Sequence, residues 1–254
     1  MKKNIFVLTS LMLTLGCGCD SFLDETNYSD VTSEGGYYDT EAGLNAVVNA
    51  CYTPLRFWAG KEDAIGLSET GTDIIAAGSG CVDNNMAAYT QSLDGTNSAC
   101  TFYFDRFYAA INWCNTAIFH AQTVPNPSND EILATTLNKR EAEARVLRTF
   151  YYWILTETFG DTYYTDQPST SIVMNPVKTS TDNIYQYMFD DLDWAIKSKL
   201  STLQNDGGRV TIWTAKALKA RLLLTRASEK NDVDMYGQAY DLAKDVIENG
   251  PFEL

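Results

Sequence analysis

The sequence predicts an all-α protein built from antiparallel helical pairs. One observation is the stretch 140–161, whose apolar residues recur at helical spacing over more than half of the helix circumference. Such a helix needs partners on two sides, so we expect it at the centre of the core. The other observation is a succession of further amphipathic segments of about 12 to 22 residues, as in stacked helical pairs. No strict repeat of about 34 residues is present, so the pattern alone does not identify tetratricopeptide units.

The first predicted helix is followed by a long irregular loop. Residues 39–41 read Asp-Thr-Glu, a typical helix start, and Pro54 limits the continuation of the helix. Its apolar face consists of Leu44, Val47, Val48 and Cys51. The stretch 59–99 is dense in Gly, Ser, Thr, Asn and Asp and has no sustained period. Loops of this size are uncommon inside a domain and are often functional.

Two long helices follow this loop. Helical spacing resumes over 102–122 and is broken by a segment with two prolines. Ser128 or Asn129 is a candidate cap for the next helix, which begins near Asp130 and runs into the central stretch. Gly160 provides the backbone freedom of its C-terminus. Charged residues indicate a solvated end with an ion-pair ladder: Arg140, Glu141, Glu143, Arg145 and Arg148.

Three helices complete the pattern. A connection, 162–178, carries short extended pieces around Tyr163 and Ile172, and Thr181 caps a helix that runs to Leu200. The next helix has two apolar seams, which include Trp213, Ala217, Ala220 and Leu224 on one side and Leu218 and Leu222 on the other. The last helix follows Asp234, and its expected inward positions are Tyr236, Ala239, Tyr240, Ala243, Val246 and Ile247.

Four stretches, spread over nearly the whole chain, resemble the SusD/RagB family. They are C-D-S-F-L-D at 19–24, E-A-R-x-L-R-x-F-Y-Y followed by F-G-D at 143–161, G-R-V-T-I-W-T-A-K-A-L-K-A-R-L-L-L at 208–224, and A-Y-D-L-A-K-D-V-I-E-N-G at 239–250. The resemblance implies an outer-membrane lipoprotein of Bacteroidota that captures nutrients, usually glycans, beside a SusC-like TonB-dependent transporter. It also implies a tetratricopeptide-like helical scaffold with long irregular loops.

The family's chains usually continue for about as long again after the motif that ends this sequence. We therefore expect 39–254 to be the N-terminal half of a SusD-like fold, truncated at its C-terminus. Where the family commonly has Val-Pro or Ile-Pro after F-G-D, this sequence has Thr162-Tyr163, so the local loop conformation should differ.

Residues 1–18 have the pattern of a lipoprotein signal peptide, with two lysines before an apolar run too short to span a bilayer. Cys17 and Cys19 follow among small residues, and either fits as the acylated cysteine; the family resemblance favours Cys19. Residues 19–38 would then be an acylated tether, and several acyl chains would give a stable anchor. No later segment is long and apolar enough to cross a membrane.

The net charge narrows the class of partner. The chain has 33 acidic and 19 basic residues, a formal charge of −14. Such an excess argues against nucleic acid, because no basic footprint exists to release counterions from phosphates. It also argues against electrostatic binding to anionic lipid headgroups. We expect a soluble, self-repelling surface.

The remaining cysteines suggest one disulfide. Cys81 and Cys100 bracket part of the irregular loop, and a bridge between them could stabilise the fold by about 3 kcal/mol. Cys51 and Cys114 lie on predicted helix faces, where buried free thiols are expected. No C-x-x-C motif is present, which argues against redox chemistry and against a zinc site. We expect neither a cofactor nor a metal.

Catalytic residues do not stand out. Glu157 and Asp161 are the best carboxylate pair for glycoside hydrolysis, but a solvated helix end explains them as well. The single histidine, His120, lies late in a helix, where it could offset the helix dipole. The acidic run 190–193 lacks the glycine and spacing of an EF-hand loop and fits a solvated helix face.

Sugar binding is better supported. It needs a flat aromatic ring beside amide and carboxylate partners, and the irregular loop supplies Asp83, Asn84, Asn85 and Tyr89. In the SusD family this segment contributes ligand contacts, so we predict the site there. Trp153, Trp194 and Trp213 are expected in the core. Trp58, at the entrance of the loop, fits a core position better than a ligand platform.

Three functions are therefore compared. The first is a surface-exposed outer-membrane lipoprotein that binds a glycan and passes it to the transporter. The second is a lipid-anchored helical adaptor that binds a protein or peptide. The third, with the least support, is an exported glycoside hydrolase.

Overall fold

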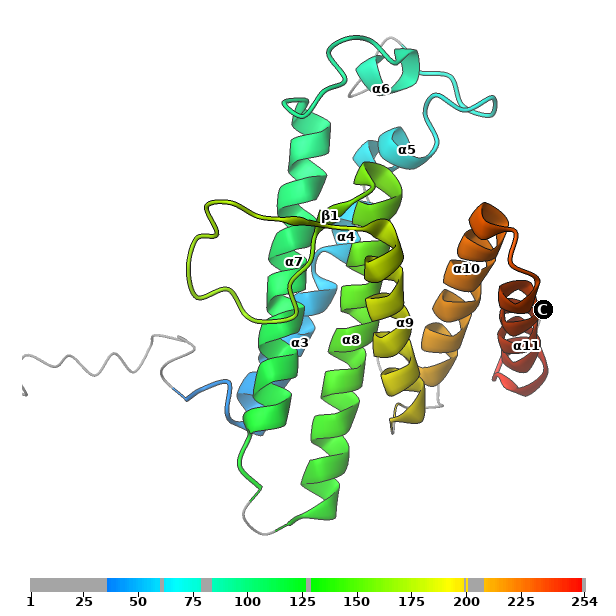
Figure 1. Cartoon of the computed structure of the whole chain (residues 1–254). Coiled ribbons are helices and arrows are strands. Elements are labelled where there is room, and N and C mark those ends of the chain that lie inside the picture. Colours follow the sequence, from blue (N-terminus) through cyan, green and yellow to red (C-terminus); the bar gives the residue numbers. More distant parts are fainter. Residues whose placement is uncertain are drawn as a thin grey trace, which may run out of the picture. The chain divides into compact units, whose positions relative to one another are not determined.

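The computed structural model describes residues 36–59, 62–78, 84–126, 129–198, 200 and 208–252. Six helices form the scaffold in Figure 1: α3 (Glu41–Tyr52), α7 (Ser98–Thr123), α8 (Glu131–Phe159), α9 (Thr181–Lys197), α10 (Ile212–Lys230) and α11 (Val233–Asn249). From α7 onward, each of these helices packs against the next one along the chain, and α3 packs against both α7 and α8. The prediction of antiparallel helical packing is confirmed.

The central helix is α8, as the sequence predicts. Asp130 caps it, because its carboxylate accepts hydrogen bonds from the backbone N–H groups of Ile132 and Leu133, so the expected cap at Ser128 or Asn129 is wrong. Gly160, with a φ of +69°, follows its last residue. Consecutive side chains of α8, which point in directions about 100° apart, are both buried at Tyr151 and Tyr152, which explains the wide apolar surface of its sequence.

The charged residues of α8 are largely buried, so the expected solvated end is wrong. Arg148, only 3% exposed, donates from Nε and Nη2 to Asp191 of α9, both at 2.8 Å. Arg145 joins the same carboxylate at 2.6 Å and also reaches Glu141 of its own helix. The Arg148 guanidinium donates in addition to Asn115 of α7 at 2.8 Å. These contacts tie α7, α8 and α9 together through paired charges.

A second charged group lies where α3 meets α8. Glu143, 3% exposed, accepts a hydrogen bond from the Tyr52 hydroxyl at 2.7 Å and pairs with Arg209 at 2.7 Å. Burial, followed by the charge of Glu143, raises the pKa of Tyr52 well above its ordinary value. Both helices are thereby tied to the segment that precedes α10.

Short helices lie in and just before the loop predicted over 59–99, which ends earlier than expected. Helix α4 (Leu55–Ala59) precedes the loop and reaches only its first residue, whereas α5 (Glu62–Ser68) and α6 (Asn84–Ala88) lie within it. Helix α7 begins at Ser98, because Asn97 caps it by accepting from the N–H groups of Ala99 and Cys100. No long helical period could reveal helices of five to seven residues.

The connection between α8 and α9 contains a two-stranded antiparallel sheet. Strand β1 (Thr162–Tyr163) pairs with β2 (Lys178–Thr179), which confirms the extended piece at Tyr163. The Tyr108 hydroxyl of α7 donates to the Tyr163 carbonyl at 2.6 Å and holds this sheet in place. The expected extended piece at Ile172 is wrong, since Ile172 lies outside both strands and is 86% exposed.

The last three helices form largely as predicted, with different ends. Ser180, not Thr181, caps α9, and that helix stops at Lys197 before the expected Leu200. In α11 only Ala239 is buried, whereas Tyr240 and Ile247 are 65% and 71% exposed. The prediction that this face of α11 is buried is therefore wrong. The predicted residues do form its apolar face, which lies toward α10.

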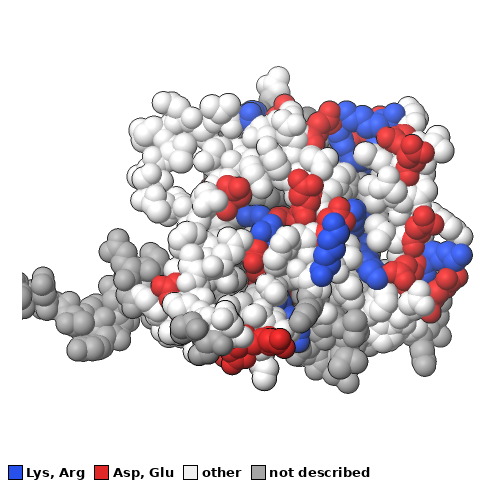
Figure 2. Space-filling view, turned by 60° about the horizontal axis from the view of Figure 1, so that its bottom comes forward, with Lys and Arg blue, Asp and Glu red and all other residues white. Residues whose placement is uncertain are grey.

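Charged side chains of both signs alternate on the face shown in Figure 2. Lysines of α10 pair with carboxylates of neighbouring helices, as in Lys216–Asp245 at 2.5 Å and Lys219–Asp193 at 2.6 Å. Such partly exposed pairs contribute little stability. Within the described ranges, every helix is too short or too polar to cross a bilayer.

Candidate functional site

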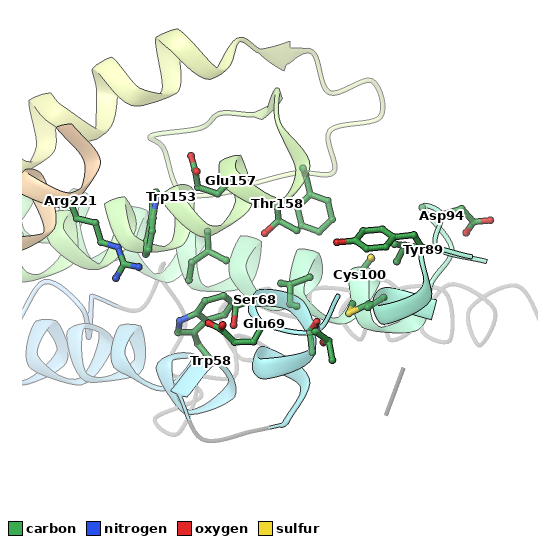
Figure 3. Close-up of a pocket in the computed structure, with 18 residues that line it drawn as sticks. Trp58, Ser68, Glu69, Tyr89, Asp94, Cys100, Trp153, Glu157, Thr158 and Arg221 are labelled. Carbon is green, nitrogen blue, oxygen red and sulfur yellow. Dashed lines mark hydrogen bonds between the residues drawn. The ribbon is translucent and has the colours of Figure 1, made fainter. Parts of the chain in front are cut away.

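A large hollow lies where the short helices α4 to α6 approach the C-terminal half of α8 (Figure 3). Its volume is about 960 Å³. We call it the Trp153 hollow and define it by its lining: Trp58, Gly66, Leu67, Ser68, Glu69, Thr70, Met86, Tyr89, Leu93, Asp94, Gly95, Cys100, Trp153, Ile154, Glu157, Thr158, Phe159 and Arg221. It combines aromatic rings, carboxylates, hydroxyl groups and one guanidinium.

One wall comes from the end of α8. Trp153 and Glu157 are four residues apart, and this spacing places them on one face of the helix. Trp153 is half-buried, and the guanidinium carbon of Arg221 lies 4.8 Å from the centroid of its ring. This wall therefore presents an indole covered by a cation beside a carboxylate. The expectation that Trp153 is simply a core residue is incomplete.

The opposite wall comes from the segments before α7. Trp58 of α4 is half-buried, and its ring meets those of Tyr103 and Phe107 of α7 at centroid distances of 6.2 and 6.1 Å. Trp58 also lines the hollow, so it belongs both to the core and to the site. Met86, 6% exposed, anchors the short helix α6 beneath the same hollow.

Tyr89 is held at the mouth of the hollow by its backbone. Its φ is +49°, in the left-handed region that few tyrosines adopt, and its side chain is 70% exposed. The ring lies against Gly71, where a Cβ atom would stand 3.0 Å from both the hydroxyl oxygen and a ring carbon of Tyr89. In Figure 3 the hydroxyl end of Tyr89 points toward the side of the hollow that carries Thr158. A glycine at position 71 thus permits this ring position.

Two carboxylates of the hollow accept hydrogen bonds from hydroxyl groups. Glu157 accepts a hydrogen bond from the Tyr185 hydroxyl at 2.5 Å, and burial, followed by this bond, raises the pKa of Tyr185 well above its ordinary value. Asp94 accepts from the Thr96 hydroxyl at 2.7 Å and from the Thr96 N–H at 2.8 Å, and these two bonds lower the pKa of Asp94. Both groups can accept hydrogen bonds from a ligand.

The structure brings only part of the predicted binding set to this hollow. Tyr89 lines it. Asn85 accepts from the Thr90 hydroxyl at 2.6 Å and is not part of the lining. Asp83 and the side chain of Asn84 fall outside the described residues, so their roles stay predictions. The same holds for Cys17, Cys19 and the bridge from Cys81 to Cys100, although Cys100 itself lines the hollow.

Sequence reasoning did not identify Glu69, Trp153, Glu157 or Arg221 as ligand contacts. For Trp153 and Glu157, the one feature of the sequence that could have indicated a site is their position near the end of the central helix, close to the segment that follows α8. Arg221 carries no such signal, because only the approach of α10 to α8 places it over the Trp153 ring.

Asp161 and His120, two of the groups considered for catalysis, are occupied elsewhere. Asp161 accepts from the N–H of Thr181 at 2.8 Å and from its hydroxyl, and these bonds lower the pKa of Asp161. Asp161 does not line the Trp153 hollow, where Glu157 lies, so the two do not face each other there. His120, 4% exposed, pairs with Asp39 at 2.7 Å beside α3. Among the residues that can be described, no cluster of side chains suited to a metal ion is found.

A second hollow, of about 550 Å³, lies between α10 and α11. We call it the α10–α11 groove, and it is lined by Ala217, Ala220, Arg221, Leu224, Tyr236, Ala239, Tyr240, Ala243, Val246 and Ile247. It has no carboxylate in its lining and few polar groups to receive sugar hydroxyls. Its apolar surface suits a packing partner better than a glycan.

Comparison with known proteins places the chain among SusD-like proteins. A model of the SusD-like family described as "Starch-binding associating with outer membrane" matches residues 72–250. A SusD-like protein of Bacteroides ovatus is 26% identical over the whole chain, which corresponds to 46% of that relative. The chain thus spans about half the length of the curated relatives it matches.

Solved structures show the same fold. A SusD superfamily protein from Parabacteroides distasonis superposes with a TM-score of 0.72 at 21% identity, covering 89% of this chain and 47% of that one. A structure solved with xylogluco-oligosaccharide superposes with a TM-score of 0.67 at 23% identity, covering 83% of this chain and 41% of that one. At such identities the similarity establishes the fold.

Proposed function

The chain belongs to the SusD-like family, and from this membership we propose that it binds a glycan or oligosaccharide in the Trp153 hollow. SusD-like glycan-binding proteins are not catalysts. In this proposal the protein is a surface-exposed outer-membrane lipoprotein, acylated at Cys19 or alternatively at Cys17. It captures nutrient glycans for a SusC-like TonB-dependent transporter.

The observation that carries the proposed site is the convergence of aromatic rings from three segments in one hollow. Trp58, Tyr89 and Trp153 come from three separate segments and line it together with the carboxylates of Glu69 and Glu157. A sugar ring can lay its C–H face on an aromatic ring while its hydroxyls donate to carboxylates. The volume of about 960 Å³ lies at the upper end of the range for ligand pockets, which favours an oligosaccharide over a single sugar.

Tyr89 is the most informative residue to replace. Its ring is exposed, so Tyr89→Ala should leave the helical scaffold and its thermal unfolding unchanged. Loss of one stacking platform should weaken binding by about 1 kcal/mol, or about fivefold in Kd. The assay is retardation in native affinity gels that contain starch, xyloglucan or another neutral polysaccharide, followed by calorimetry with oligosaccharides of the best ligand.

Tyr240→Ala is the matched control, because Tyr240 is similarly exposed but lines the α10–α11 groove. It should not change retardation. Equal retardation of wild type and Tyr89→Ala would remove Tyr89 from the site. Absence of retardation of the wild type in every gel would argue against glycan binding itself.

The alternative function, a lipid-anchored adaptor for a protein or peptide, is favoured only by the α10–α11 groove. Leu224, Tyr240 and Ile247 expose apolar surface there. Co-purification of a protein that is lost on Ile247→Gln, together with no carbohydrate retention, would support this alternative.

A further inference from the structure

On α10, Arg221 is the only cation without a carboxylate partner within the described residues. The other cations of this helix all form ion pairs, which are Lys216–Asp245, Lys219–Asp193, Arg226–Asp182 and Lys230–Asp182. Carboxylates are not scarce, because the chain has 33 acidic and 19 basic residues. Arg221 instead lines the Trp153 hollow, so its guanidinium is available to a ligand there.

The guanidinium of Arg221 is placed by stacking and not by a charge pair. Its central carbon lies 4.8 Å from the centroid of the Trp153 ring. Stacking uses the flat face of a guanidinium, whereas its N–H groups point outward from the edge. Arg221 is exposed, so these donors remain accessible. Figure 3 shows Arg221 and Trp153 together on one side of the hollow, and Tyr89 and Asp94 on the other.

A sugar in the hollow needs hydrogen-bond donors as well as acceptors. Sugar hydroxyls both donate and accept, and carboxylates satisfy only the hydrogens that they donate. The hydroxyls of Ser68 and Thr70 already donate to backbone carbonyls of α5. The indole N–H of Trp153 is buried and cannot reach a ligand. Arg221 therefore offers the largest set of free N–H donors in the described lining.

The charge of the lining indicates which oxygen atoms Arg221 can receive. Glu69, Asp94 and Glu157 outnumber Arg221 in the described lining. The hydrogen bonds from the hydroxyl and the N–H of Thr96 lower the pKa of Asp94, so this residue is charged at neutral pH. A carboxylate or sulfate on the ligand would meet these like charges, whereas a hydroxyl carries no net charge. The lining therefore favours neutral sugar units.

We propose that Arg221 determines the specificity of the Trp153 hollow by donating two parallel hydrogen bonds to adjacent hydroxyl oxygens of a neutral sugar unit. This inference rests on the glycan binding proposed above and adds to it the recognising donor and the class of sugar. The planar fork of a guanidinium matches two neighbouring oxygens, which the single ammonium of a lysine does not. The aromatic rings and Arg221 would then hold different units of one oligosaccharide.

The test compares Arg221→Gln and Arg221→Lys with the wild type. The assay is retardation in affinity gels that contain the neutral polysaccharide that the wild type retains best, followed by calorimetry with its oligosaccharides. Arg221→Gln should raise Kd about tenfold, because hydrogen bonds to a charged donor are lost. Arg221→Lys keeps the charge and can still stack on Trp153, but it lacks the fork, so Kd should rise at least about threefold.

Lys216→Gln is the matched control. Lys216 lies on the same helix and over the ring of Trp213, at 4.6 Å, but it does not line the hollow. This variant should bind like the wild type. Since Arg221 is exposed, both Arg221 variants should unfold at nearly the wild-type temperature. Wild-type affinity of Arg221→Lys would overturn the proposal, because Arg221 would then act only by covering Trp153. Wild-type affinity of Arg221→Gln would overturn it as well.

A second arm tests the class of sugar. The best polysaccharide is carboxymethylated in one sample and hydroxyethylated to the same degree in another, so that the two differ in charge at similar bulk. The wild type should retain the carboxymethylated sample at least about tenfold more weakly, and salt should narrow this difference because it screens like charges. Stronger retention of the carboxymethylated sample, lost in Arg221→Gln, would assign Arg221 to a carboxylate and overturn the proposal.

The outcomes separate this inference from the glycan binding on which it rests. A wild type that no polysaccharide retards would refute glycan binding and the role of Arg221 together. A wild type that is retarded by a neutral polysaccharide, with Arg221 variants that are retarded equally, would refute the role of Arg221 alone.

Discussion

Replacing Arg148 with methionine should lower the free energy of unfolding by about 3 kcal/mol. Burial alone would lower the pKa of Arg148, but the charge of Asp191 outweighs this effect and holds the pKa above its ordinary range. Methionine fills similar space and removes both hydrogen bonds to Asp191, which is itself 5% exposed. Breaking a buried pair from one side costs about 3–5 kcal/mol, and the remaining bond from Arg145 places the cost at the lower end.

The assay is urea unfolding at neutral pH, followed by circular dichroism and tryptophan fluorescence to test for a single transition. A loss of this size corresponds to a Tm lowered by about 6–12 °C. Lys230→Met is the matched control, because its pair with Asp182 is largely exposed and should contribute less than about 1 kcal/mol.

The double variant Arg148→Met/Asp191→Leu distinguishes the cost of leaving one buried charge behind from the net contribution of the pair. Removing both charges eliminates the buried carboxylate that would keep only its bond from Arg145, so this variant should be more stable than Arg148→Met alone. The reasoning is refuted if Arg148→Met costs no more than Lys230→Met, or if the double variant is less stable than the single one.

Two further predictions concern the hollow and the loop after α8. Gly71→Ala should displace the Tyr89 ring and weaken glycan retention about as much as Tyr89→Ala does, because position 71 has a φ of +88° and no room for a Cβ atom; unchanged retention would show that the ring position is not needed. Asp161→Ala should be less stable than the wild type at pH 7. Since the pKa of Asp161 is lowered in the folded protein, its contribution is present above the unfolded pKa near 3.9 and is lost as the pH falls through the lower folded value. Thermal unfolding from pH 7 to pH 2.5 should show the difference narrowing, and a constant difference would contradict this assignment.

The helices could be predicted because the spacing of their apolar residues follows directly from which side of each helix is buried. The wide apolar surface of 140–161 required covering on two sides, and α8 is indeed packed by α3, α7 and α9. Caps were less predictable, since Asp130 and Ser180 compete with neighbours of equal propensity. The spacing of apolar residues in α11 predicted which residues form its apolar face. Such spacing does not indicate whether another element covers that face.

Charge and site geometry depend on contacts that the sequence does not encode locally. Asp191 reads as one carboxylate in a solvated acidic run, and only the approach of α8 makes it the partner of Arg148. Tyr89 was identifiable because an aromatic ring in a polar loop is unusual. Trp153 and Arg221 were not, because residues of α8 and α10 meet at the hollow only after the helices pack.

The most direct test of the proposed site is a crystal structure of the protein with the oligosaccharide that it retains best in affinity gels. We predict a sugar ring packed on Trp58 or Tyr89, with its hydroxyls hydrogen-bonded to Glu69, Glu157 or Asp94. A sugar bound in the α10–α11 groove, or on any surface away from the Trp153 hollow, would contradict the account.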